Sequence, residues 1–138
     1  MLHRDTLAEV ELFREESVPL KTKVRQLDQQ YDTVCGAMTV EFEGETKTLP
    51  QMSKYLESTD RALREKAWRT VAHRRLEDRD AIDGIYDEMV KLRHEIAGQA
   101  GFDNFVGYTF KSMHRFDYTP AYCRKFHSAV DEVVIPFC

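Results

Sequence analysis

The chain of 138 residues has the length of one domain, and its composition, 42% hydrophobic and 32% charged, excludes global disorder. Its 20 basic and 24 acidic side chains give a formal net charge of -4, and no segment of the chain is basic. This charge argues against a nucleic-acid partner and against an anionic membrane surface, because both would need a basic face.

The cysteines are odd in number and widely separated, at Cys35, Cys123 and Cys138. This pattern predicts free thiols in a reducing compartment. The sequence has no apolar run long enough to span a membrane and no signal-peptide core near its start. We therefore expect a cytoplasmic protein, with residues 1–138 forming a single helical domain.

The first 34 residues predict a short helix, a bend near Pro19 and a second helix over about 18–34. Proline suits the first turn of a helix, and Ser17 is an acceptable N-cap. Apolar residues recur through this region at helical spacing and are expected to face the core. They are Val10, Phe13, Leu20, Val24, Leu27, Tyr31 and Val34.

Residues 38–48 predict a β-hairpin. Apolar and polar residues alternate from Met38 to Phe42, and Gly44 supplies a turn before a second short strand. Two strands alone are marginally stable in water. We expect the hairpin either to lie on a helical core or to extend a sheet from outside this chain.

The rest of the chain predicts helices, so the fold class is all-α with one small hairpin near 38–48. A short helix is expected at 49–57, then one long helix at 61–99 or two helices broken near 77–84. Two apolar stripes mark this region. The first is Ala62, Leu63, Ala67, Trp68, Val71 and Ala72, and the second is Ile82, Ile85, Met89, Leu92 and Ile96.

Capping signals set the ends of these helices. Asp60 is expected to cap the helix that follows it, and Gly101 is a suitable helix stop. A further helix is expected after Phe102. The last helix should run over about 120–135, beginning at Thr119-Pro120 and ending at Pro136.

No catalytic centre stands out, and we assign no catalytic, cofactor-binding or metal residue. His94-Glu95 begins the H-E-x-x-H pattern, in which two histidines hold zinc and the glutamate activates water, but Gly98 stands where the second histidine is needed. We interpret His94 as a polar surface residue. No orienting group identifies a Cys/His nucleophilic pair.

A partial metal-ligand set is the alternative for the last helix. Cys123 and His127 lie four residues apart, and His114 would have to fold back to join them. A zinc site uses three or four ligands, so we expect no stoichiometric zinc. The simpler interpretation of Cys123 is a small buried apolar residue.

Two clusters remain. An aromatic cluster predicts core or interface packing, with a peptide-binding surface as the alternative. Its members are Phe102, Phe105, Tyr108, Phe110, Phe116 and Tyr118. A charged run predicts a solvated helix face with local ion pairs. It consists of Arg61, Arg64, Glu65, Lys66, Arg69, Arg74 and Arg75.

Several separated motifs occur in a characteristic order. They are Val18-Pro19-Leu20, Gly36-Ala37-Met38-Thr39-Val40, Asp60-Arg61-Ala62-Leu63-Arg64-Glu65-Lys66, Leu92-Arg93-His94-Glu95-Ile96-Ala97 with Ala100-Gly101-Phe102-Asp103-Asn104-Phe105, and Arg115-Phe116-Asp117-Tyr118-Thr119-Pro120. Together they resemble the oligoendopeptidase F family of zinc metallopeptidases, which is similar to thimet oligopeptidase, over nearly the whole chain.

The resemblance implies a larger helical protein, shaped like a bowl or clam, that cleaves short peptides in an enclosed cavity. Its zinc is held on an H-E-x-x-H helix with a further glutamate downstream. This chain would be an internal segment upstream of that helix and would form wall or lid scaffold of the cavity. No zinc ligand or catalytic base carries over, so the chain alone is expected to be inactive.

The alternative is a non-catalytic helical interaction module. Because the chain starts at Met1 and ends at Cys138, we expect it to be a fragment. Its expected partner is the remainder of a peptidase chain. Apolar faces that have lost their neighbours also predict a homo-oligomer. The candidate faces are the Phe102–Tyr118 cluster, the hairpin edge, and the last helix with Phe126, Val130 and Val133.

Overall fold

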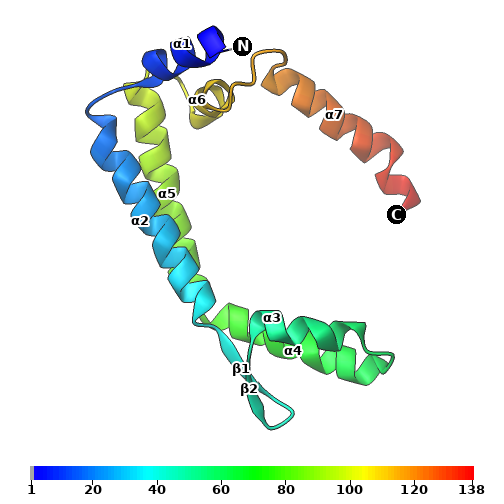
Figure 1. Cartoon of the computed structure of the whole chain (residues 1–138). Coiled ribbons are helices and arrows are strands. Elements are labelled where there is room, and N and C mark those ends of the chain that lie inside the picture. The colour runs from blue at the N-terminus through cyan, green and yellow to red at the C-terminus, as the bar shows by residue number, and fades with distance from the viewer. Residues whose placement is uncertain (1) are drawn as a thin grey trace. The chain divides into compact units, whose positions relative to one another are not determined.

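The structure is a computed structural model that describes residues 2–138. The elements follow in chain order (Figure 1): α1 (Leu2–Leu12), α2 (Ser17–Gly36), β1 (Thr39–Phe42), β2 (Glu45–Thr48), α3 (Leu49–Met52), η1 (Ser53–Glu57), α4 (Arg61–Glu77), α5 (Arg79–Gln99), α6 (Phe105–Ser112), α7 (Pro120–Val133) and η2 (Ile135–Phe137). The elements η1 and η2 are short 3-10 helices. The predicted all-α class with one small hairpin is confirmed.

The chain forms two compact units. One contains the residues up to Thr22 together with Lys91–Cys138, and the other contains Lys23–Val90. We call them unit 1 and unit 2. None of the helices in the described part of the chain is both long and apolar enough to cross a membrane.

The hairpin of unit 2 is antiparallel, with Phe42 paired to Glu45 and Thr39 paired to Thr48. Both turn residues have positive φ, 54° at Glu43 and 79° at Gly44. This is the type I′ turn, whose twist matches that of the flanking strands.

The core of unit 2 forms where this hairpin packs on helices. Val40 and Phe42 alternate with exposed residues along β1 and are buried together with Met52 and Ala67. Partly buried residues of α3, η1 and α4 surround them, namely Leu49, Tyr55, Leu63 and Val71. The hairpin therefore lies on a helical core, the first of the two alternatives. α3 begins with a capping box, in which Thr48 and Gln51 satisfy each other's backbone groups.

The long helical region is two helices, not one. Asp60 caps α4 as predicted, accepting a hydrogen bond from the Ala62 backbone N–H at 2.9 Å. α4 ends at Glu77 and α5 begins at Arg79, and at this junction Asp78 pairs with Arg74 at 2.6 Å. The break falls where no apolar anchor holds the helix, whereas Gly84 lies inside α5.

Unit 1 is held by the end of α5 and the helices that contact it. The Ser17 hydroxyl donates to Gln99 Oε1. Gly101, with φ 84°, ends the helix, and Phe102 N–H reaches the Ala97 carbonyl at 2.9 Å. This is a Schellman cap. Asn104 then caps α6.

Of the residues in the first 34 that were predicted to face the core, three are exposed: Val10, Phe13 and Tyr31. Val10 and Phe13 are exposed, because the buried face of α1, which contacts α6, carries Ala8 and Leu12 instead. Trp68 is exposed on α4, where the stripe of Leu63, Ala67 and Val71 faces the hairpin. Along α5 the predicted stripe is confirmed, with Met89, Leu92 and Ile96 buried.

Candidate functional site

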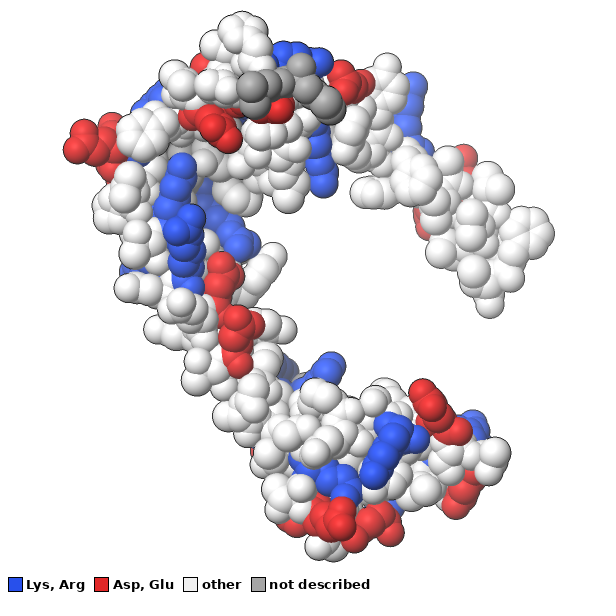
Figure 2. All heavy atoms as spheres, in the orientation of Figure 1, with Lys and Arg blue, Asp and Glu red and all other residues white. Residues whose placement is uncertain are grey.

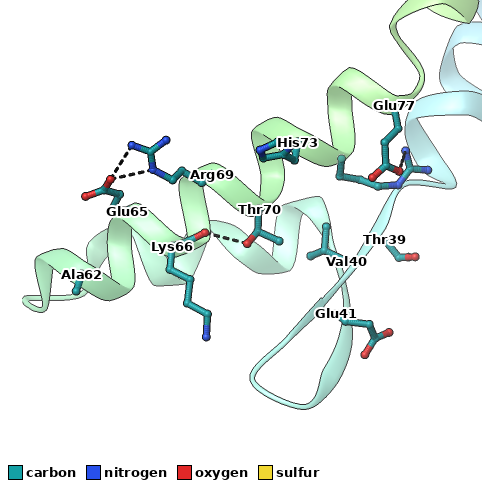
Figure 3. Close-up of a pocket in the computed structure, with 11 residues that line it drawn as sticks. Thr39, Val40, Glu41, Ala62, Glu65, Lys66, Arg69, Thr70, His73 and Glu77 are labelled. Carbon is teal, nitrogen blue, oxygen red and sulfur yellow. Dashed lines mark hydrogen bonds and ion pairs between the residues drawn. The ribbon is translucent and has the colours of Figure 1, made fainter.

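Unit 2 has a groove between β1 and α4, with a volume of ≈ 870 Å³ (Figure 3). Thr39, Val40 and Glu41 line it from the strand. Figure 3 shows Glu41 pointing away from α4. The other wall is α4, through Ala62, Glu65, Lys66, Arg69, Thr70, His73, Arg74 and Glu77.

The cations along this groove are paired with carboxylates. Arg69 contacts Glu65 at 2.8 Å, Arg74 contacts Glu77 at 3.4 Å, and Lys66 reaches Glu43 in the hairpin turn at 2.7 Å. The Thr70 hydroxyl donates to the Lys66 carbonyl at 2.9 Å. The groove thus has no excess of positive charge for an anionic ligand. The predicted local ion pairs of the charged run are confirmed.

The buried face of the hairpin holds one charged side chain, that of Lys47 in β2. Lys47 is only 6% exposed and donates to Glu45, and its Nζ lies 6.0 Å from the centre of the Tyr55 ring. The hydrogen bond from Lys47 lowers the pKa of Glu45 below its ordinary value. The same bond raises the pKa of Lys47. This pair braces the hairpin and was not predicted from the sequence.

His94 and Glu95 are both exposed on α5, as expected for a polar helix surface. Gly98 has nothing within 4 Å of the position that a Cβ would occupy. It therefore supplies neither a ligand nor a close contact.

The second candidate metal-ligand set, Cys123, His127 and His114, is not brought together. Cys123 is half-buried and His127 exposed, and both line an open hollow of ≈ 500 Å³ beside Tyr118, Tyr122 and Phe126. His114 contacts Asp5 at 3.7 Å and stacks on Phe116 instead. Across residues 2–138, no three His, Cys, Asp or Glu side chains are grouped as a metal site needs. The residues present do not fit a zinc ion, and we derive no step through one.

The aromatic cluster packs inside unit 1. Tyr108 is buried, with Phe105 stacked on it at 5.6 Å between ring centres and Phe102 meeting it edge-on at 5.9 Å. A second pair, Phe110 and Tyr118, lies 5.7 Å apart. These contacts support the packing interpretation of the cluster.

Neither a family sequence model nor a curated protein sequence matches the chain. Solved structures do match. PZ peptidase A with inhibitor 2 superposes with a TM-score of 0.93 at 30% identity, over 98% of this chain and 24% of that one. A Bacillus anthracis protein assigned as oligoendopeptidase F gives a TM-score of 0.91 at 27% identity, over 99% of this chain and 25% of that one.

A third structure, also assigned as oligoendopeptidase F, gives a TM-score of 0.93 at 27% identity, over 99% of this chain and 24% of that one. The chain therefore spans about a quarter of the length of these relatives. Its fold is that of a helical peptidase segment. The resemblance predicted from the motifs is confirmed: nearly the whole chain is similar to a segment of PZ peptidase A and of two proteins assigned as oligoendopeptidase F.

Proposed function

We propose that this chain is a scaffold segment of a zinc-dependent oligopeptidase that hydrolyses short peptides, forming wall or lid of the peptide cavity. The observation that carries the proposal is the superposition of nearly the whole chain on about a quarter of PZ peptidase A. In this proposal peptide hydrolysis belongs to residues outside the matched quarter.

Two features support a scaffold role in place of a catalytic one. The sequence has no H-E-x-x-H motif, and its nearest approach, His94-Glu95, lies on an exposed surface of α5. The groove between β1 and α4 carries charges that are already paired. Packed helices and a braced hairpin are suited to holding a cavity wall in place.

A cytoplasmic location belongs to the same proposal. Its support is that Cys35, Cys123 and Cys138 are all free thiols.

A chimera tests the function. PZ peptidase A whose matching quarter is replaced by residues 1–138 should hydrolyse a short fluorogenic peptide, whereas the same enzyme with that quarter deleted should not. The isolated 138-residue chain should leave the peptide intact. A chimera that fails to fold, or that folds without activity, would contradict the proposal, because an equivalent scaffold must pack against the rest of the enzyme.

The alternative, a non-catalytic helical interaction module, is favoured by one observation, the exposed apolar surface of α7. The genomic sequence that follows Cys138 separates the two. An in-frame H-E-x-x-H supports the peptidase, and a native stop codon supports the module.

A further inference from the structure

α7 is the most amphipathic helix of unit 1. Its large apolar side chains follow one another at intervals of four, four, three and four residues into η2, as Tyr122, Phe126, Val130, Val133 and Phe137. This spacing forms one stripe along a helix. We call these five residues the α7 stripe. The opposite side of α7 carries polar residues, among them Arg124, Ser128 and Asp131.

Four of the five residues in the α7 stripe are exposed to solvent, and Val130 is half-buried. No residue of α7 is buried, Phe126 is 67% exposed, and Phe137 in η2 is 88% exposed. In Figure 2 the spheres at this end of the chain are mostly uncharged. An exposed apolar stripe of this length marks an interaction surface.

We propose that the α7 stripe pairs with the same stripe of a second copy of this chain, with the two helices antiparallel. A two-fold axis near Ala129 would place the first half of one stripe on the second half of the other. The order of the residues suits this arrangement, since large side chains stand on both sides of that point.

Charge selects the antiparallel direction. Lys125 and Glu132 lie seven residues apart, two helical turns, and so flank the stripe on the same side. Neither has an ion-pair partner within the part of the chain that the structure describes. In the antiparallel pair Lys125 lies level with the partner's Glu132, which makes two symmetric ion pairs. Flanking charges of this kind set the orientation of paired helices.

Shape supports the same direction. The hollow of ≈ 500 Å³ beside the start of α7 is lined by Tyr118, Tyr122, Cys123 and Phe126, together with the polar residues Asp117 and His127. In an antiparallel pair the partner's Phe137 reaches this end of the helix. Each copy then offers one aromatic side chain and one hollow with a mainly aromatic lining, as an isologous two-fold contact requires.

Other occupants fit the helix less well. Helices that lie on anionic membranes carry an excess of Lys and Arg on the polar face, whereas in α7 Arg124 and Lys125 are balanced by Asp131 and Glu132. The remainder of a peptidase chain is the other candidate, and the experiments separate it from a second copy.

Sedimentation equilibrium of the 138-residue chain is the first test. The mass should rise from 16.2 kDa towards twice that value as the concentration increases. Phe126→Glu should hold it at the monomer mass, while Ser128→Glu on the polar side should not. Phe126 is exposed, so its substitution should leave the helical circular dichroism unchanged.

A charge exchange tests the orientation. Lys125→Glu alone and Glu132→Lys alone should each weaken association, and the double variant should restore it. A parallel pair does not place these two residues side by side, so failure of the double variant to rescue would overturn the antiparallel arrangement.

The native cysteines give a second readout of direction. Cys123 and Cys138 lie about 22 Å apart along α7 and η2, at roughly 1.5 Å per residue. A short bismaleimide cannot bridge them within one copy. It should join Cys123 of one copy to the partner's Cys138 and should leave Cys35 unlinked.

A link between two Cys138 residues would overturn the antiparallel direction. A chain that stays monomeric at its highest concentration would overturn the self-pairing and leave the peptidase remainder as the occupant of α7. All three measurements use this chain alone, so their outcome is independent of the chimera that tests the proposed function.

Discussion

Ala67 and Trp68 are adjacent on α4, yet Ala67 is 0% exposed and Trp68 is 60% exposed. With 3.6 residues per turn, one step along a helix moves a side chain by more than a quarter of a turn. The hairpin covers only the row of Leu63, Ala67 and Val71. Helical spacing predicts which residues form an apolar stripe along α4. It does not predict how many of these residues the neighbouring hairpin will cover. This is why Trp68 belongs to the predicted apolar stripe of α4 and is nevertheless exposed.

Substitution of the single tryptophan should therefore cost little. Trp68→Ala should change the free energy of unfolding by about 0.5 kcal/mol or less, as at other exposed positions. Met52→Ala, at a residue 1% exposed, should cost about 2–5 kcal/mol. Urea unfolding followed by circular dichroism measures both. Equal losses in the two variants would show that Trp68 is buried.

The Glu45–Lys47 pair should make the hairpin sensitive to acid. The pKa of Glu45 is held below its ordinary value of 4.5 by Lys47, so its contribution is present above that pH and is lost as the pH falls through the lower, folded value. Wild type should lose stability relative to Glu45→Gln as the pH falls below 4.5 and through the lower folded pKa, where the carboxylate takes up its proton.

Thermal unfolding across that pH range measures the difference, with Glu57→Gln, an exposed carboxylate in η1, as the matched control. A constant difference between wild type and Glu45→Gln would mean that the pair adds nothing to the stability.

The alternation of the strand predicted one buried face. It did not predict that a lysine, braced by its own neighbour, would occupy that face.

At the scale of elements, the signals with a local physical cause were the ones that held. Asp60 accepts a backbone hydrogen bond at the start of α4, and Gly101 takes the left-handed conformation that ends α5. The sequence left the junction at Asp78 open between one helix and two, because a polar stretch in a helix is compatible with both.

Replacing Gly44 and Gly84 with alanine should have opposite effects on the stability of the chain. Gly44 has φ 79° in the hairpin turn, so Gly44→Ala should destabilise by about 1–2 kcal/mol. Gly84 lies inside α5 with nothing within 4 Å of a Cβ, so Gly84→Ala should stabilise by about 0.5–1 kcal/mol. Chemical denaturation of the two variants gives the signs, and a stabilised Gly44→Ala would rule out the type I′ turn.

At the scale of the whole molecule, the fold class and the resemblance to peptidases could be predicted from sequence patterns, whereas the surfaces could not. Motifs such as Arg115-Phe116-Asp117-Tyr118-Thr119-Pro120 point to the peptidase family through their residues and order alone, and the superposed peptidases agree. The groove between β1 and α4 depends on residues far apart in the sequence, from Thr39 to Glu77. Periodicity within single elements carries no information on such a juxtaposition.

The chain should hold no stoichiometric zinc. A zinc site uses three or four ligands, and the two partial sets in this chain each fall short. His94 has Gly98 where its partner would stand, and Cys123 with His127 offers two donors on one helix while His114 contacts Asp5. Elemental analysis of protein purified without a metal-affinity tag should give well under one zinc per chain. A ratio near one that is lost in Cys123→Ser or His127→Ala would show that α7 completes a site with ligands from elsewhere, most simply from the second copy. A ratio near one that survives both substitutions but is lost in His94→Ala would place the metal on α5. Either result would mean that this segment binds zinc as part of its function.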